Sequence, residues 1–242
     1  SGVPDGIWVS RVEASHYAEG TCYVTFDGHR SDMFQPWVFK TTVFGKTWAS
    51  LAGSLPDGQV AYVIREDLIN RDLLFLGTEF GLFVSTDGGG TWERFMNNLP
   101  TVAVHDIRIH PHARDLVIGT HGRGIWICDD ITPLQQLNSS VKAEAAHLFD
   151  ARTATQWMSV SRGGSRGQFL FRGQNPFSGA FVHYYLGPDV EDPILEISDF
   201  KGEMVFTPKL ADKPGINRFV WNYNFNPPEL NDDEKALAEK FT

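Results

Sequence analysis

Residues 85–92 have the sequence Ser-Thr-Asp-Gly-Gly-Gly-Thr-Trp, and this stretch decides the fold. Its aspartate is followed by glycines, which suits a tight turn in which a carboxylate accepts backbone N–H groups and glycine permits a positive φ. The threonine favours the outgoing strand, and the tryptophan ring can pack between neighbouring sheets. We therefore predict a β-hairpin in which five residues have a structural role, namely Ser85, Asp87, Gly89, Thr91 and Trp92.

The same hairpin occurs once more upstream in a degenerate form. Residues 40–48 have the sequence Lys-Thr-Thr-Val-Phe-Gly-Lys-Thr-Trp, and Trp48 precedes Trp92 by 44 residues. Val43 occupies the position of Asp87, so this turn must be held without the carboxylate. The structural residues that we expect in this copy are Thr41, Gly45, Thr47 and Trp48.

Short apolar runs surround both hairpins and repeat with them. Residues 74–78 and 81–84 have counterparts at 116–120 and 124–127, and residues 21–26 and 37–40 fill the same positions in a first copy. The runs are β-branched and aromatic and are separated by Gly, Asp, Asn or Pro, which is typical of antiparallel strands. In the middle copy we predict four strands, at residues 60–64, 73–77, 81–85 and 92–95.

A four-stranded unit of about 40–45 residues has the size of a β-propeller blade. The sequence predicts an all-β fold with about three such blades in residues 1–137, the third without its last hairpin. Strand patterns return after a stretch of mixed composition. We therefore expect a linker and irregular segment at residues 138–178, a compact Ig-like β module at 179–226 and a polar C-terminal tail at 227–242.

A family resemblance is carried by the hairpin and its surroundings. Residues 85–92 fit the pattern S-x-D-x-G-x-T-W and resemble the Asp-box, or BNR repeat, of sialidases, sortilin-type receptors and xyloglucanase-like propellers. Residues 78–92, 104–111 and 119–131 are similar to large bacterial repeat proteins described as sortilin-like or glycosyl-hydrolase-like. In those proteins the propeller is followed by an Ig-like module like that of the flagellar hook-capping protein, which residues 194–221 resemble.

The resemblance implies an architecture and an extracytoplasmic location, secreted or periplasmic. It also implies that the Asp-box hairpins lie at the propeller periphery, away from any central pocket. Propellers typically have 4–8 blades, so three blades cannot close a ring. We expect the remaining blades to come from the same longer chain or from another chain, because an open arc leaves sheet faces uncovered.

Composition excludes several classes of protein. The formal net charge of −9 argues against a nucleic-acid partner, because nucleic-acid binders concentrate Lys and Arg. No apolar run approaches the roughly 20 residues of a membrane span. Cys22 and Cys128 lie in apolar runs without a nearby Cys or His, which indicates free buried thiols. His110 and His112 share a strand face but have no third ligand nearby, so we expect no metal and no cofactor.

Two polar loops supply the candidate ligand-binding residues. Loops on a rigid scaffold are where binding residues concentrate, and the longest polar loop of the repeats starts at residue 27. In the last blade a Gly-flanked loop offers a histidine and an arginine, which could bind an anionic ligand, act as acid and base, or serve only as a hairpin. The candidates are Asp27, His29, Arg30, Asp32, His121 and Arg123.

Catalytic residues cannot be assigned from the sequence. Asp129 and Asp130 form an acidic pair, yet adjacent strand residues point to opposite faces, so we interpret them as turn residues that end the blade. Our leading hypothesis is a non-catalytic binding or scaffolding segment of a larger protein, with a glycan or a protein as ligand. The alternatives are part of a sialidase- or xyloglucanase-like glycoside hydrolase, and a peptidase- or transport-associated module.

Overall fold

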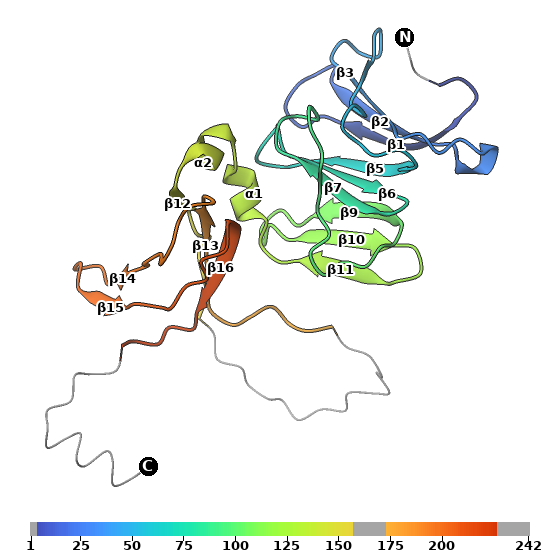
Figure 1. The fold of residues 1–242 in the computed structure, drawn as a ribbon. Coiled ribbons are helices and arrows are strands. Elements are labelled where there is room, and N and C mark those ends of the chain that lie inside the picture. The colour runs from blue at the N-terminus through green and yellow to red at the C-terminus, as the bar shows by residue number, and fades with distance from the viewer. Residues whose placement is uncertain (1–3, 157–172, 227–242) are drawn as a thin grey trace, which may run out of the picture. The chain divides into compact units, whose positions relative to one another are not determined.

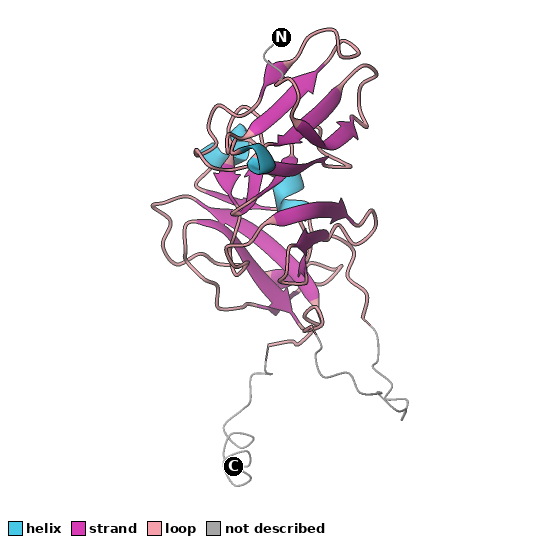
Figure 2. Ribbon diagram, turned by 90° about the vertical axis from the view of Figure 1, so that its right-hand side faces the viewer, coloured by secondary structure: helices cyan, strands magenta, loops and turns pink. Residues whose placement is uncertain are grey.

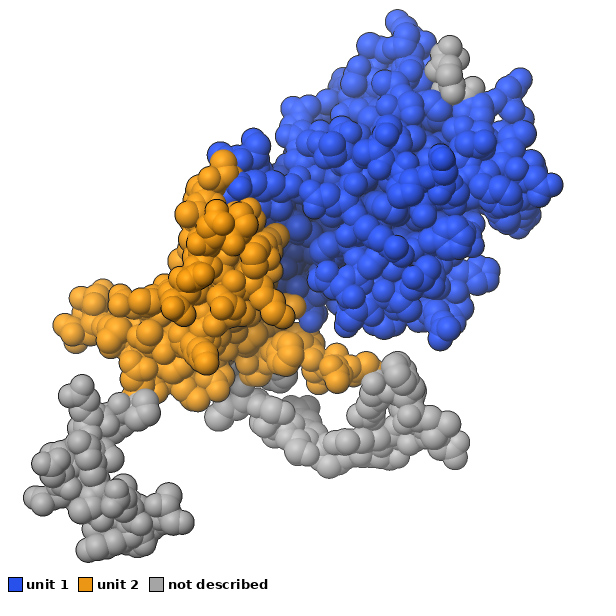
Figure 3. Space-filling model, in the orientation of Figure 1, with its two compact units in different colours: residues 1–142 blue, residues 143–242 orange. Residues whose placement is uncertain are grey.

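The computed structural model describes residues 4–156 and 173–226, which form two compact units, residues 1–142 and residues 143–242 (Figure 3). In the described part the chain is built from antiparallel β-sheets, and the helices are short (Figure 2). The predicted all-β fold is therefore confirmed. Residues 157–172 of the predicted linker and the predicted tail at 227–242 lie outside the described residues. No helix of the described residues is long and apolar enough to cross a membrane.

Unit 1 contains three antiparallel sheets that follow one another along the chain (Figure 1). The first has the order β1 (Trp8–Ala14), β2 (Cys22–Asp27), β3 (Trp37–Thr41) and β4 (Ala49–Ser50). The second has the order β5 (Ala61–Glu66), β6 (Leu74–Thr78), β7 (Gly81–Ser85) and β8 (Glu93–Arg94). In the described residues the third has three strands, β9 (Val104–Ile109), β10 (Leu116–Thr120) and β11 (Ile125–Cys128). The three sheets coincide with the three sequence repeats.

The three sheets pack face to face, because their alternating side chains are apolar on the faces that meet. The core between the first and second sheets includes Tyr23, Val38, Ile64, Leu76 and Trp92. The core between the second and third sheets is formed by buried side chains of both sheets, among them Val63, Phe75, Val84, Val104, Ile107 and Leu116. The ring of Trp92 thus packs between neighbouring sheets, as the sequence predicted.

The first strands of the three sheets, β1, β5 and β9, are neighbours in space and are joined by ion pairs. Arg11 Nη2 lies 2.7 Å from Asp106 Oδ1, and Arg65 Nη1 lies 2.5 Å from Glu13 Oε2. Arg65 Nε also donates to the carbonyl oxygen of Ile107 at 3.0 Å. Because each contact joins two different sheets, this network fixes the order in which the sheets stack.

The hairpin at residues 85–92 joins β7 to β8, and the carboxylate of Asp87 organises its turn. Asp87 Oδ1 accepts the N–H of Thr91 at 2.9 Å, and Oδ2 accepts the hydroxyl of Thr91 at 2.7 Å. The hydroxyl of Ser85 donates to Asp87 at 2.7 Å and accepts the N–H of Gly89 at 2.9 Å. Burial works against ionisation of Asp87, yet these hydrogen bonds outweigh it and lower the pKa of the carboxyl below its usual value.

The degenerate hairpin between β3 and β4 keeps half of this arrangement. Thr41 Oγ1 accepts the N–H of Gly45 at 3.0 Å and that of Val43 at 3.3 Å, so it takes the place of the Ser85 hydroxyl. Phe44 stands where the other copy has Gly88, and its φ of 55° lies in the region that favours glycine. The hairpin is therefore held by a hydroxyl and carries backbone strain.

Replacing Val43 by aspartate is expected to stabilise this hairpin. The new carboxylate would accept the N–H and the hydroxyl of Thr47, as Asp87 does with Thr91, and Val43 is already partly exposed. We expect the free energy of unfolding to rise by about 0.5–1 kcal/mol, measured by denaturant unfolding near neutral pH. The gain should shrink in a Thr47→Val background. An aspartate variant less stable than the parent would show that the two turns differ in more than one side chain.

After β11 the chain leaves the third sheet through a turn and two short helices, α1 (Thr132–Gln136) and α2 (Ser139–Ala143). Asp130 has a φ of 58°, and its Oδ1 accepts the N–H of Thr132 at 3.1 Å. Gln135 of α1 donates to Asp67 Oδ2 at 2.9 Å, which ties the helix to the second sheet. Asp130 therefore serves as a turn residue.

Unit 2 has a three-stranded sheet and a two-stranded sheet. The first has the order β12 (Ala146–Leu148), β13 (Ala180–Leu186) and β16 (Gly215–Trp221), and the second pairs β14 (Ile197–Ser198) with β15 (Met204–Phe206). The expected linker at 138–178 therefore contributes β12 to a sheet. Phe181 is buried beneath the guanidinium groups of Arg152 and Arg218, which lie 5.5 Å and 5.0 Å from its ring centroid.

Candidate functional site

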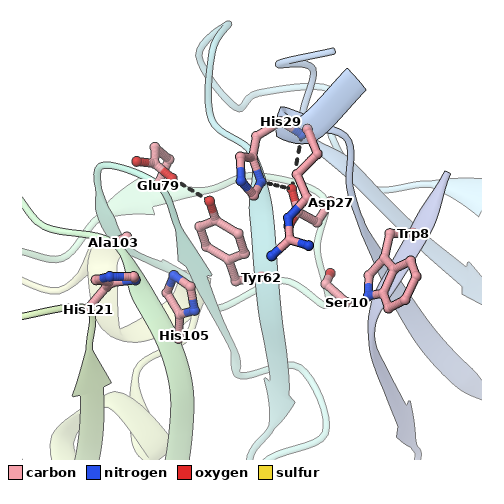
Figure 4. A pocket seen from close by; sticks show the side chains of 10 residues that line it. Trp8, Ser10, Asp27, His29, Tyr62, Glu79, Ala103, His105 and His121 are labelled. Carbon is pink, nitrogen blue, oxygen red and sulfur yellow. Dashed lines mark hydrogen bonds and ion pairs between the residues drawn. The ribbon is translucent and has the colours of Figure 1, made fainter. Parts of the chain in front are cut away.

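One end of the stacked sheets in unit 1 is hollowed into a pocket of about 580 Å³. This volume lies in the range of small-molecule sites, roughly 300–1,000 Å³. All three sheets contribute side chains to it, as Figure 4 shows. The lining residues are Trp8, Ser10, Asp27, His29, Arg30, Tyr62, Glu79, Ala103, His105 and His121.

Three of the lining residues occupy the same unusual backbone position in successive sheets. Pairing of the first and second strands skips one residue of the first strand, and the skipped residue is Ser10 in β1, Tyr62 in β5 and His105 in β9. Each is thus the extra residue of a β-bulge. A bulge bends its strand and re-aims a side chain, and bulges are frequent beside functional sites.

A second equivalent position supplies three more lining residues. Phe26, Thr78 and Thr120 pair with the residue just before each bulge, and the next residue along the chain is Asp27, Glu79 and His121, respectively. Six of the ten lining residues therefore come from two repeat positions, each used three times. Because the sheets stack in register, these positions converge at one end of unit 1.

Aromatic and imidazole rings form a continuous row across the pocket. The rings of Tyr62 and His105 are stacked, with centroids 4.2 Å apart and planes at 24°. His29 meets Tyr62 edge to face at 6.3 Å, and His121 meets His105 at 5.1 Å. The row runs from His29, in the loop after β2 of the first sheet, through Tyr62 of the second sheet to His105 and His121 of the third.

Hydrogen bonds orient the two carboxylates of the pocket. Asp27 Oδ1 lies 2.5 Å from His29 Nδ1 and accepts the backbone N–H of His29 at 3.0 Å. The hydroxyl of Tyr62 donates to Glu79 Oε2 (Figure 4). Burial of Tyr62, followed by this bond and the charges of Glu79 and Asp27, raises the pKa of the phenol well above its usual value. Tyr62 therefore stays protonated and holds the Glu79 carboxylate in place.

Several polar groups of the pocket keep bonding capacity for a ligand. Among the contacts within the described residues, Asp27 and Glu79 each use one carboxylate oxygen, and the guanidinium of Arg30 makes no hydrogen bond or ion pair. Trp8 is 78% exposed at the edge of the pocket. The arrangement offers acceptors, donors and a ring face to one bound molecule.

The structure brings together four of the six residues that we singled out in the polar loops. Asp27, His29, Arg30 and His121 line the pocket. Asp32 and Arg123 belong to the same loops but are outside the lining; Asp32 ends the 3-10 turn His29–Ser31, and the carbonyl of Arg123 accepts the indole N–H of Trp126 at 3.1 Å. No residue of either Asp-box hairpin is among those that line the pocket.

Sequence reasoning missed Tyr62, Glu79 and His105. A signal for one of them was present, because the repeated run Leu-Phe-Leu-Gly-Thr at 74–78 is followed by Glu79 just as the run at 116–120 is followed by His121. The bulges could not be predicted from the sequence, because the skipped residues Ser10, Tyr62 and His105 are alike in neither size nor polarity. Trp8 and Ser10 lie on a strand for which we had no residue-level prediction.

Two other predictions about cysteine and metal concern this unit. Cys22 and Cys128 form no disulfide, and both are only partly buried, whereas buried thiols were expected. Burial, followed by the charge of Glu13, raises the pKa of Cys22 above the usual thiol value. In the described ranges no group of three or more His, Cys, Asp or Glu side chains is arranged to hold a metal ion.

In comparisons with known proteins, the chain matches only in its three-dimensional structure. No family model matches the chain, and no curated protein matches it. Among solved structures, the GH74 xyloglucanase from Xanthomonas campestris is 19% identical over 57% of this chain and 22% of its own, with a TM-score of 0.43. YCF48 from Cyanidioschyzon merolae is 13% identical over 76% of this chain and 52% of its own, with a TM-score of 0.33.

PorZ, a surface component of the type-IX secretion system of Porphyromonas gingivalis, is 12% identical over 90% of this chain and 26% of its own, with a TM-score of 0.37. The chain spans only 15% to 24% of the length of the GH74 enzymes that it resembles. At these identities the likeness concerns the fold alone. The chain is similar to β-propeller proteins in the form of its sheets.

Proposed function

We propose that the chain is a non-catalytic binding segment of a larger Asp-box propeller protein, and that its pocket holds a saccharide. The observation that carries this proposal is the pocket built from two repeat positions of three sheets. A saccharide presents hydroxyl groups that both donate and accept, and apolar C–H faces that pack on aromatic rings. The free oxygens of Asp27 and Glu79, the Arg30 guanidinium and the exposed Trp8 ring match these features.

Further sheets are expected to complete the propeller, from the same longer protein or from another chain. The third sheet supports this part of the proposal. On β11, which has no strand beyond it in the described residues, Ile125 is 75% exposed and Ile127 is 59% exposed. An additional blade packed on this sheet would bury them. The Ig-like character of unit 2 and an extracytoplasmic location, both implied by the resemblance, belong to the same proposal.

Saccharide binding is tested with an immobilised glycan screen followed by calorimetry on the full chain. Replacing Trp8 by alanine removes the exposed ring, and we expect the affinity for the selected glycan to fall about tenfold, equivalent to about 1.4 kcal/mol. Phe200→Ala is the matched control, because Phe200 is 94% exposed and belongs to unit 2. Equal affinity of the Trp8 variant and the parent would remove the pocket from consideration.

A glycoside hydrolase is the second candidate, since Asp27 and Glu79 place two carboxylates from different sheets in one pocket. The arginines of the neighbouring strands do not favour a sialidase, because Arg11 and Arg65 already pair with Asp106 and Glu13. Hydrolysis of a bound glycan that is abolished by Asp27→Asn and by Glu79→Gln would establish catalysis. That result would overturn the non-catalytic part of our proposal and leave saccharide binding intact.

A further inference from the structure

Three histidines line the pocket. His29 lies in the loop after β2 of the first sheet, whereas His105 and His121 belong to the third sheet, and together they account for three of the ten lining residues. Histidine is the side chain whose ordinary pKa, about 6.5, lies within the physiological range. The three imidazoles are also connected through the ring row, because Tyr62 stands between His29 and His105.

The imidazoles of the third sheet are available to a ligand. Within the described residues, the ring nitrogens of His105 and His121 make no hydrogen bond. Both residues are exposed to solvent, although the stacked ring of Tyr62 covers part of His105. Arg30 adds a guanidinium from the loop of the first sheet. When both imidazoles are protonated, each ring is a cation with N–H groups that can donate to a ligand. The guanidinium of Arg30 supplies further N–H donors.

Protonation inverts the formal charge of the pocket. With neutral imidazoles, the carboxylates Asp27 and Glu79 and the single guanidinium of Arg30 give the lining a formal charge of −1. With three imidazolium groups the same lining has a formal charge of +2. The remaining lining side chains, including the protonated phenol of Tyr62, carry no charge.

The neighbours of His105 shift its protonation to lower pH. Burial and the adjacent His121 lower the pKa of His105 below its ordinary value, and the charges of Glu79 and Asp27 oppose this shift without cancelling it. A group with a lowered pKa takes up its proton only as the pH falls further. The inversion of charge is therefore completed on the acid side of neutrality.

We propose that the pocket is a proton-gated site for an anionic group, such as a carboxylate, sulfate or phosphate, which His105, His121 and Arg30 bind once the imidazoles are protonated. At neutral pH the ionised Asp27 and Glu79 exclude the same group by like-charge repulsion. This inference deepens the proposed function, because the anionic group can be a substituent of an acidic saccharide. It can equally be a free inorganic anion, so the two sources are tested separately.

The test follows the imidazole resonances of the full chain by NMR at about pH 5 and about pH 7.5. One arm adds inorganic sulfate and the other adds glucuronate. We expect saturable shifts of the His105 and His121 resonances, with an apparent affinity about tenfold higher at the acid pH. Binding of sulfate alone assigns the site to free anions. Tighter binding of glucuronate, lost in Trp8→Ala, assigns it to an acidic saccharide.

The double variant His105→Gln/His121→Gln tests whether anions bind at this pocket or bind non-specifically to the protein at acid pH. Both positions are exposed, and neither belongs to a hydrophobic core, so thermal unfolding should match the parent. Because the variant lacks both reporter imidazoles, its anion affinity at the two pH values is measured by calorimetry. We expect the pH dependence of this affinity to be lost in the variant, whereas the surface control His112→Gln keeps it. Equal affinity at both pH values in the parent, or an unchanged response in the double variant, would overturn the proposal. Neutral-glycan binding does not depend on this outcome, so the proposed function can survive its failure.

Discussion

Replacing Gly77 by alanine is expected to lower the free energy of unfolding by roughly 2–3 kcal/mol, which is large for the addition of one methyl group. Gly77 lies in β6 where the second sheet faces the third. A Cβ at this position would lie 2.6 Å from the carbonyl oxygen of Val104 and 2.6 Å from Val63 Cγ1. The oxygen belongs to the backbone of β9, so the third sheet must move to make room. Denaturant unfolding of the full chain measures the loss.

Gly119 provides the matched control for this prediction. It occupies the position of Gly77 in the next repeat, 42 residues later, yet a Cβ there would meet Asp106 only at 3.6 Å, an ordinary contact distance. Gly119→Ala should therefore leave stability within about 0.5 kcal/mol of the parent. Equal effects of the two substitutions would mean that loss of glycine itself, and not the approach of the third sheet, determines the result.

The second large effect is expected at Glu66, whose side chain is 1% exposed between the first and second sheets. Its carboxylate accepts the hydroxyl of Tyr23 at 3.0 Å, the hydroxyl of Ser15 at 2.9 Å and the N–H of His16 at 2.7 Å. Glu66→Leu leaves these donors without an acceptor. We expect a loss of about 3 kcal/mol, because unsatisfied buried groups keep their full desolvation cost.

A double-mutant cycle with Tyr23→Phe checks the cause of this loss. Removing the phenol hydroxyl takes away one of the orphaned donors, so the double variant should be more stable than the sum of the single losses predicts, by about 1 kcal/mol. Strictly additive losses would contradict the hydrogen-bond explanation and leave only altered packing around Glu66.

The fold was accessible from sequence because its signals are local. The sequence at residues 85–92 specifies a hairpin through contacts between side chains and backbone only a few residues apart, and the structure contains those contacts between Asp87 and Thr91. The 44-residue spacing of Trp48 and Trp92 then identifies the repeat. The four strands of the second sheet were found within one or two residues of their ends.

The candidate site was accessible only in part. Asp27, His29, Arg30 and His121 were found because polar residues in loops of a β-repeat are conspicuous, while Asp32 and Arg123 in the same loops are outside the pocket lining. The side chains of one loop point in different directions, and the sequence does not show which of them face the pocket. Tyr62 and His105 were missed because a strand residue is assigned to a face by alternation, and a bulge breaks that alternation.

The sequence by itself determined the hairpins and the repeat, because each depends on residues that are close along the chain. Only the tertiary structure decided that the bulge residues Ser10, Tyr62 and His105 meet at one pocket with Asp27, Glu79 and His121. The physical reason is that stacking of three sheets in register converts equivalent positions, 42 to 52 residues apart, into neighbours. The hairpin at residues 85–92 thus specifies the scaffold, whereas the first strands of the sheets and the residues Asp27, Glu79 and His121 supply the site.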